Sequence, residues 1–135
     1  MQLLGEERHF DCFHTCLEEK GLFVNEGKII DASFVEVPRR RNRREENEII
    51  KQGCGSTLWE ENPHKKCQKD IDARWTEKNG QRFYGYKDHA KIDAKSKLID
   101  TYEVTGAEVH DSQPTEKLLR KNDKGQELYA DSAYR

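Results

Sequence analysis

Apolar residues at helical spacing mark the start of the chain. Phe10, Phe13 and Leu17 recur at intervals of three and four residues, which is the spacing of one helix face. Gly21 follows a basic residue and is typical of a helix end. The pattern predicts a helix over residues 1–21 that covers one face of the structure that follows.

Two predicted strands each carry an aspartate. Residues 28–37 are rich in β-branched and aromatic residues, and Asp31 lies inside their apolar stretch. Residues 127–131 form a second, short strand with Asp131 at its exit. A crossover connection that includes a helix can return the chain to a strand beside the first. We therefore expect a mixed sheet in which Asp31 and Asp131 lie on adjacent strands.

The segment between these strands predicts a hairpin and a helix. Residues 81–93 and 98–105 alternate in the manner of half-buried strands and are separated by a polar turn. Ser112–Glu116 offers a capping residue and an early proline, so a helix is expected to begin there. Leu118 and Leu119 would form its buried side.

Residues 38–80 are polar, basic and short of apolar periodicity. We predict a short helix at residues 44–51 and a loop elsewhere, since connections of this length are usually functional or disordered. Across all 135 residues, 33% are hydrophobic and 37% are charged, with a mean hydropathy of -1.10. Apolar material this scarce must be concentrated in a few elements, enough for one domain with a single core.

Charge is balanced overall but not locally. The net charge of -2 does not indicate a partner. Two stretches of the predicted loop, however, are rich in basic residues. These residues are Arg39, Arg40, Arg41, Arg43, Arg44, Lys65, Lys66 and Lys69. A locally basic loop suits contact with a phosphate backbone, although a solvated surface explains the charge equally well.

Membrane and zinc-binding classes are not supported. No apolar run approaches the roughly 18 residues of a membrane helix, and no secretory signal begins the chain. We expect a cytoplasmic protein with reduced cysteines. Neither Cys12 with Cys16 nor Cys54 with Cys67 has the tight paired spacing of a zinc ribbon or finger, so free or buried thiols are favoured.

The two aspartates suit phosphodiester chemistry. Such transfer requires in-line positioning of two oxygens and neutralisation of the developing charge, which paired divalent ions supply. Magnesium is typically held by one or two carboxylates, with water and substrate phosphates completing its shell. By itself the pair is a weak signal among 26 acidic residues, and a solvated acid on a half-exposed strand explains Asp31 as well.

Six stretches of the chain form one ordered set: GKIIDASFV at residues 27–35, four more at residues 37–47, 69–76, 84–89 and 109–113, and LYADSAY at residues 128–134. Together and in this order they resemble the insertion-sequence DDE transposases of the IS-five-like group. The first stretch is similar to the strand of that family's first aspartate, and the last to the strand of its second. The resemblance covers nearly everything from Gly21 to the end.

This resemblance implies an α+β fold, an RNase H-like mixed sheet with flanking helices, and Mg²⁺- or Mn²⁺-dependent strand cleavage and transfer. Asp31 and Asp131 match the family's two aspartates and would be catalytic metal ligands. No residue here matches the glutamate, which the family carries on a later helix. We therefore expect a truncated fragment, inactive alone, without the last strand and the Glu-bearing helix. Residues 1–26 would be a helical segment and residues 27–135 a partial catalytic domain, with a basic insertion at about 38–80.

Double-stranded DNA at transposon ends is the partner that the resemblance implies, with a second copy or an intact transposase as further candidates. Besides the basic residues of the insertion, Lys87 and His89 are expected to contact DNA. A different class stays open, a non-catalytic DNA-binding remnant or regulator of an intact transposase, as does a fragment without any function.

Several side chains have two interpretations. Trp59 and Trp75 could stack on bases, but pinning the insertion onto the core is favoured. Tyr84 and Tyr86 could line the active face or pack in the core. His110 and Asp111 could approach the metal site, although a turn-and-cap role is favoured.

Overall fold

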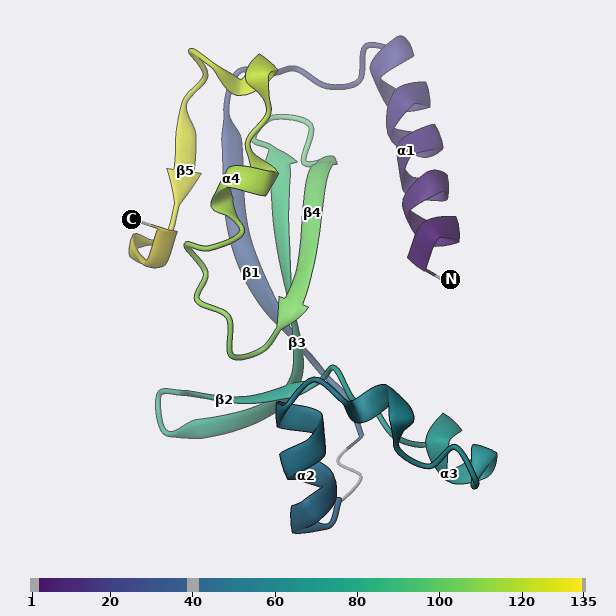
Figure 1. Cartoon of the computed structure of the whole chain (residues 1–135). Helices are drawn as coiled ribbons and strands as arrows, with labels where there is room; N and C mark the ends of the chain where they lie inside the picture. Colours follow the sequence, from purple (N-terminus) through teal and green to yellow (C-terminus); the bar gives the residue numbers. More distant parts are fainter. Residues whose placement is uncertain (1–2, 39–41, 135) are drawn as a thin grey trace. The chain divides into compact units, whose positions relative to one another are not determined.

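Five strands form one mixed sheet, and three of them have residues in both compact units of the chain. The computed structural model describes residues 3–38 and 42–134. The elements are α1 (Leu3–Glu19), β1 (Lys28–Glu36), α2 (Arg44–Lys51), η1 (Gly55–Thr57), α3 (Pro63–Cys67), β2 (Arg74–Lys78), β3 (Gln81–Asp93), β4 (Ile99–Gly106), α4 (Thr115–Leu118), η2 (Lys121–Asp123), β5 (Leu128–Ala130) and η3 (Ser132–Tyr134). The strand order is β2-β3-β1-β5, and β4 also pairs with β3 (Figure 1).

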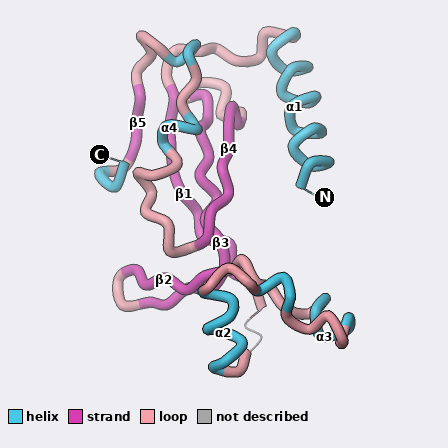
Figure 2. The backbone as a smooth tube through the Cα atoms, viewed as in Figure 1, coloured by secondary structure: helices cyan, strands magenta, loops and turns pink. Residues whose placement is uncertain are grey.

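The chain divides into two compact units. The first comprises Met1–Ser33, Asp88–Val104 and His110–Arg135, and the second comprises Phe34–Lys87 and Thr105–Val109. Strands β1, β3 and β4 begin in one unit and end in the other, as their bounds require. The helices and strands of both units are distinguished by colour in Figure 2.

The strands with aspartates agree with the sequence prediction. β1 and β5 pair in parallel, whereas β2 and β3 pair antiparallel, so the sheet is mixed as predicted. The hairpin of β3 and β4 and the short helix α2 also lie where the pattern placed them.

Two element predictions were wrong. Residues 38–80 contain the one-turn helix α3 and the strand β2, where a loop was expected. The helix expected after Ser112 is a single turn, α4, because the backbone becomes extended at Leu119. Leu118 is fully buried, but Leu119 is 40% exposed, so only one of the two leucines serves the core.

Helix α1 packs through a stripe that matches the predicted one only in part, because Phe10 and Leu17 are half-buried but Phe13 is not. His14 is buried, and Phe13 is 62% exposed. The ring of Phe10 meets Tyr102 of β4 edge to face, with centroids 4.8 Å apart, and the ring of His14 lies 4.9 Å from that of Phe23. His14 lies one turn after Phe10, so the packed stripe contains a polar residue that a search for apolar periodicity passes over.

Charged side chains occupy much of the interior of the first unit. Lys91 is fully buried, and its Nζ lies 3.0 Å from Oδ2 of Asp100. The same ammonium group donates a hydrogen bond to Asp123 of η2. Lys28 is 2% exposed, and its Nζ lies 3.3 Å from Asp100 Oδ2 and 3.8 Å from Asp93 Oδ2. Buried charges are tolerated when each has partners, so this network replaces part of an apolar core.

Asp93 closes the turn between β3 and β4. Its Oδ1 accepts hydrogen bonds from the backbone N–H groups of Lys95 and Ser96 and from the Ser96 hydroxyl. Oδ2 accepts a hydrogen bond from the Asn25 backbone N–H at 2.7 Å. Burial acts to raise the pKa of Asp93, but these hydrogen bonds outweigh it and the pKa is lowered. The carboxylate therefore remains charged in the interior.

In the second unit, Glu46 of α2 holds the neighbouring segments together. Its Oε1 accepts hydrogen bonds from the indole N–H of Trp59 at 2.8 Å and from Lys65 Nζ at 2.6 Å. Oε2 accepts one from the Arg43 backbone N–H at the start of the helix. The Lys65 hydrogen bond, followed by those from Trp59 and Arg43, lowers the pKa of Glu46 to about 2. The Glu46 carboxylate therefore connects three segments of the insertion, those of Arg43, Trp59 and Lys65.

Candidate functional site

Asp31 and Asp131 stand at matching positions on neighbouring strands. The parallel register pairs Lys28 with Leu128, Ile29 with Tyr129, and Ile30 with Ala130. Asp31 and Asp131 are the residues that immediately follow the last of these pairs. Both are exposed, although Ile30 beside them is 2% exposed. The two carboxylates are thus presented to solvent from a rigid base, as a site built on strands requires.

Local hydrogen bonds orient each aspartate in the same way. Asp31 Oδ1 accepts a hydrogen bond from the backbone N–H of Ala32 at 2.8 Å. Asp131 Oδ1 accepts from the backbone N–H of Ser132, and also from its hydroxyl at 3.2 Å. Each carboxylate thus uses Oδ1 for the protein, whereas its Oδ2 accepts no hydrogen bond from residues 3–38 or 42–134.

Tyr134 lies in the electrostatic field of three carboxylates. Burial raises the pKa of its hydroxyl, and the negative charges of Asp111, Asp31 and Asp131 raise it further. The hydroxyl therefore stays protonated at neutral pH and can donate a hydrogen bond. Its oxygen lies 3.5 Å from Nδ1 of His89, which is fully buried.

His110 and Asp111, for which either a place near the metal site or a turn-and-cap role was considered, differ in their surroundings. His110 has a turn role, since its Nδ1 lies 2.9 Å from the Ser112 hydroxyl and accepts the Ser112 backbone N–H at 3.3 Å. Asp111, in contrast, is close enough to Tyr134 to raise the pKa of its hydroxyl. Asp111 thus belongs to the same acidic surroundings as Asp31 and Asp131.

A divalent cation fits the chemistry of these donors. Two exposed aspartates with available oxygens match the one or two carboxylates that usually hold Mg²⁺. Within residues 3–38 and 42–134, no group of three or more His, Cys, Asp or Glu side chains is arranged to hold a metal ion. Water, DNA phosphate or a further protein ligand would have to complete the coordination shell.

The basic residues expected to contact DNA divide into four groups. Arg39, Arg40 and Arg41 lie outside the described residues. Arg43 and Arg44 are exposed, Arg44 by 94% of its side chain. The exposed Lys66 donates to the Ser56 carbonyl at 2.8 Å and keeps its remaining donor capacity for solvent or phosphate.

Lys65 and Lys69 are held within the second unit. Lys65 pairs with Glu46 at 2.6 Å, and Lys69 Nζ donates to Asn42 Oδ1 at 2.7 Å. Both ammonium groups lie over the Trp59 ring, at 5.3 and 5.7 Å from its centroid. These contacts give the two lysines a structural role beside any contact with DNA.

Lys87 and His89 are buried, at 9% and 0% exposed. Lys87 Nζ donates to the Val109 carbonyl at 2.7 Å and lies 5.5 Å from the centroid of the Phe34 ring. Burial removes both side chains from the surface that DNA could reach. Tyr84 and Tyr86 also turn to the protein, and the Tyr86 hydroxyl donates to the Asp70 carboxylate.

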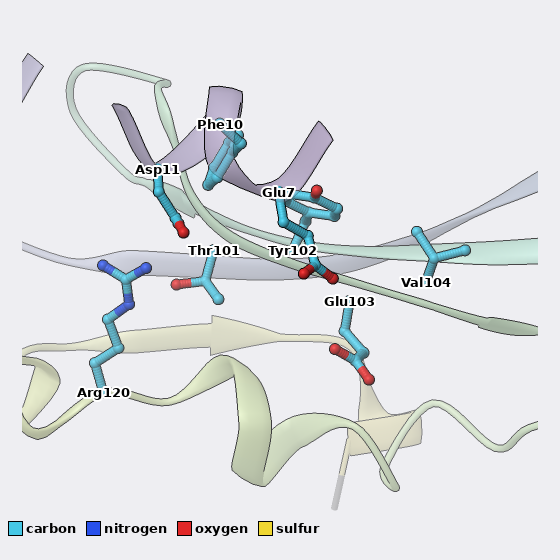
Figure 3. Close-up of a pocket in the computed structure, with 8 residues that line it drawn as sticks. All are labelled: Glu7, Phe10, Asp11, Thr101, Tyr102, Glu103, Val104 and Arg120. Atoms are coloured by element: carbon cyan, nitrogen blue, oxygen red, sulfur yellow. The ribbon is translucent and has the colours of Figure 1, made fainter. Parts of the chain in front are cut away.

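A hollow elsewhere in the first unit contains none of these residues. It lies between α1 and β4, has a volume of about 410 Å³, and is shown in Figure 3. Glu7, Asp11 and Glu103 supply carboxylates to it, and Arg120 a guanidinium group. The evidence that Asp31 and Asp131 form a pair is therefore the register of β1 and β5, and not this hollow.

Comparison with known proteins identifies relatives over most of the chain. Residues 23–135 match the family model described as transposase DDE domain. The chain is similar to the transposase for insertion sequence element IS1106 of Neisseria meningitidis serogroup B, with 32% identity over 125 residues. These residues are 87% of this chain and 39% of that protein. No solved structure matches the chain. None of the helices in the described residues is long and apolar enough to cross a membrane.

Proposed function

Because the chain belongs to the family of transposase DDE domains, we propose that it supplies two acidic metal ligands for cleaving and joining DNA strands. The ligands are Asp31 and Asp131, within an RNase H-like catalytic domain of which residues 27–135 are a part. The observation that carries the proposal is the parallel register of β1 and β5, which brings the two aspartates to corresponding positions.

The chain's own residues have distinct tasks in this proposal. Asp31 and Asp131 would hold Mg²⁺ or Mn²⁺, while hydrogen bonds to their Oδ1 atoms keep both side chains oriented. A bound divalent ion supplies charge neutralisation for the phosphoryl group being transferred. Tyr134 remains a neutral hydroxyl donor beside the carboxylates, since burial and their charges raise its pKa.

DNA contact is proposed for the exposed part of the basic insertion. Arg43, Arg44 and Lys66 are at the surface of the second unit, and the sequence continues this charge through Arg39–Arg41. Cationic side chains gain affinity for DNA by displacing condensed counterions from its phosphates. The partner proposed is double-stranded DNA at the ends of an insertion sequence.

A second candidate function is DNA binding without strand cleavage. It is favoured by the exposed side chains of Arg43, Arg44 and Lys66, which need no metal ion to contact phosphate groups. The chain spans 39% of the length of its relative, so a third ligand from further protein is compatible with either function.

A plasmid assay distinguishes the two candidates. Supercoiled DNA is incubated with the chain and Mn²⁺, and Asp31→Ala is compared with Asp11→Asn, an exposed aspartate of α1. Nicking that requires metal and is lost only in Asp31→Ala supports strand cleavage. DNA binding without nicking supports the second candidate, and the absence of both overturns the proposed function.

A further inference from the structure

We propose that Cys12 and Cys16 of α1 bind a thiophilic divalent cation of the Zn²⁺ class, together with the same two residues of a second copy of the chain. Four thiolates around one ion is a usual arrangement of structural zinc, and each copy supplies half of these ligands. The site lies apart from the acidic pair of β1 and β5, and it does not depend on the function proposed above.

The two cysteines lie one turn apart on the same side of α1. The helix is continuous over Leu3–Glu19, and the Lys20 backbone N–H still donates to the Cys16 carbonyl at 3.3 Å. Residues at i and i+4 of a helix have Cβ atoms about 5–6 Å apart. Two thiolates bound to one tetrahedral zinc ion, each at about 2.3 Å, are about 3.8 Å from each other. Rotation about χ1 of each side chain can bring the two sulfur atoms to this separation.

Both thiols lie opposite the packed side of α1. The two cysteines are exposed, whereas Phe10 and Leu17 are half-buried and His14 is buried. Since each residue of a helix is turned about 100° from the one before, Cys12 lies about 160° around the axis from both Phe10 and His14. A partner can therefore approach the cysteines without moving the helix from β4.

One copy of the chain supplies only two ligands. Among the side chains that the structure describes, no group of three or more His, Cys, Asp or Glu could hold a metal ion. Structural zinc sites are almost always four-coordinate, with protein ligands at every position. The pair therefore requires two further ligands from outside the chain. A second copy related by a two-fold axis brings the same pair to the ion, because equivalent surfaces meet in such an interface.

Charged side chains beside the pair suit such a centre. Arg8 precedes Cys12 by four residues and Lys20 follows Cys16 by four, so each lies one turn from a thiol on the same side of the helix. Both are exposed, as is Glu19 beside them. One divalent ion with four thiolates has a net charge of about -2. The four cations from two copies offset this charge and that of the two glutamates, so the surroundings are close to neutral.

Cys54 and Cys67 provide the comparison within the same chain. Both are exposed, but Cys54 precedes η1 and Cys67 ends α3. Cys54 Sγ donates to the Gln52 carbonyl at 3.9 Å. No helical turn holds these two thiols side by side, so they are matched controls for thiol chemistry without the spacing of one helix side.

Co²⁺ in place of Zn²⁺ tests the site, because cobalt bound to thiolate sulfur has a charge-transfer absorption that cobalt bound only to oxygen lacks. The full chain, kept reduced, is titrated with Co²⁺ while this absorption is recorded. Sedimentation equilibrium with and without Zn²⁺ measures the number of copies in the assembly. We expect the absorption to saturate at one ion per two chains and the sedimenting mass to double when Zn²⁺ is added.

Single substitutions identify the ligands. Cys12→Ser and Cys16→Ser should each lose both the charge-transfer absorption and the doubling, whereas Cys54→Ser and Cys67→Ser should keep both. Cys16→His keeps a zinc ligand at the same position, so it should still double in mass, with a weaker charge-transfer absorption. Circular dichroism of each variant establishes that α1 remains helical.

The outcomes separate the metal site from its partner. Absence of the charge-transfer absorption in the unsubstituted chain, or its persistence in both serine variants of α1, overturns the metal site. Equal loss in all four serine variants overturns the assignment to α1. Absorption that saturates at one ion per chain without doubling of the mass overturns the role of the second copy. The function proposed for Asp31 and Asp131 is tested separately, since cobalt held by carboxylates gives no thiolate absorption.

Discussion

The imidazole Nε2 of His14 lies 3.0 Å from the Asp100 Oδ1 atom, which joins α1 to β4 across 86 positions of sequence. Asp100 also lies within ion-pair distance of Lys28, Lys91 and Arg120. Burial raises the pKa of Asp100, but the Lys91 hydrogen bond and the positive charges nearby outweigh it and lower the pKa. One carboxylate is thus shared by two buried ammonium groups, those of Lys28 and Lys91.

Replacing Asp100 by Asn should destabilise the first unit by about 3–5 kcal/mol, because buried cations would lose their shared partner. Urea unfolding followed by circular dichroism measures the change in the free energy of unfolding. Glu26→Gln is the matched control, since Glu26 pairs with Lys95 at the surface and such a pair contributes only about 0–1 kcal/mol. Equal losses in both variants would contradict the role given to Asp100.

Acid should weaken the second unit through Glu46. The pKa of Glu46 in the folded chain is about 2, below its ordinary value of 4.5. Its contribution to stability is therefore complete above pH 4.5 and is lost as pH falls toward 2. Glu46→Gln should cost about 1–3 kcal/mol at neutral pH and flatten the pH dependence in this window. The fluorescence of Trp59, recorded in a Trp75→Phe background, measures local unfolding as pH is lowered. If Glu46→Gln leaves the pH dependence of this unfolding unchanged, the prediction is wrong.

Gly85 should not tolerate a side chain. Its φ is +153°, and an added Cβ would lie 2.1 Å from the Val35 carbonyl oxygen. Gly85→Ala is expected to cost about 3 kcal/mol or more, since neither backbone can move without breaking the ladder. Gly80 at the hairpin tip also has positive φ, at +75°, but nothing lies within 4 Å of its added Cβ. Gly80→Ala should therefore cost about 1–2 kcal/mol, and thermal unfolding that ranks the variants in the opposite order would refute this account.

The sequence predicted most strands because their patterns are local. The β-branched run of β1 and the alternation of β3 specify extended backbone without reference to distant residues. The parallel neighbours β1 and β5 were also accessible, since both strands were recognised and a crossover connection joins them.

Long-range polar contacts account for what the sequence did not predict. His14 is buried because Asp100 satisfies it from another element, so the packed face of α1 could not be found from hydrophobicity. The burial of lysines in the first unit could not be predicted for the same reason, since Lys91 is paired with the distant residues Asp100 and Asp123. Lys87 and His89 were expected to line an exposed active face because alternate residues of a strand share one side, but both side chains are buried.

In the candidate site, the sequence supplied Asp31 and Asp131 but not their surroundings. Tyr134 was missed, although an aromatic residue three positions after Asp131 is a signal that could have been followed. The environment of Trp59 was also beyond sequence reasoning, since Glu46 accepts the hydrogen bond of its indole N–H from 13 positions away.

The measurement that tests the central claim most directly is Mn²⁺ binding, followed by electron paramagnetic resonance of the free ion. The full chain is compared with Asp31→Asn and Asp131→Asn, and with Asp11→Asn as an exposed aspartate outside the pair. The account predicts that the chain binds Mn²⁺ and that either site variant weakens binding about tenfold or more, as loss of a ligand should, while the Asp11 variant does not. Mn²⁺ binding that is absent, or that is unchanged in both site variants, would contradict it.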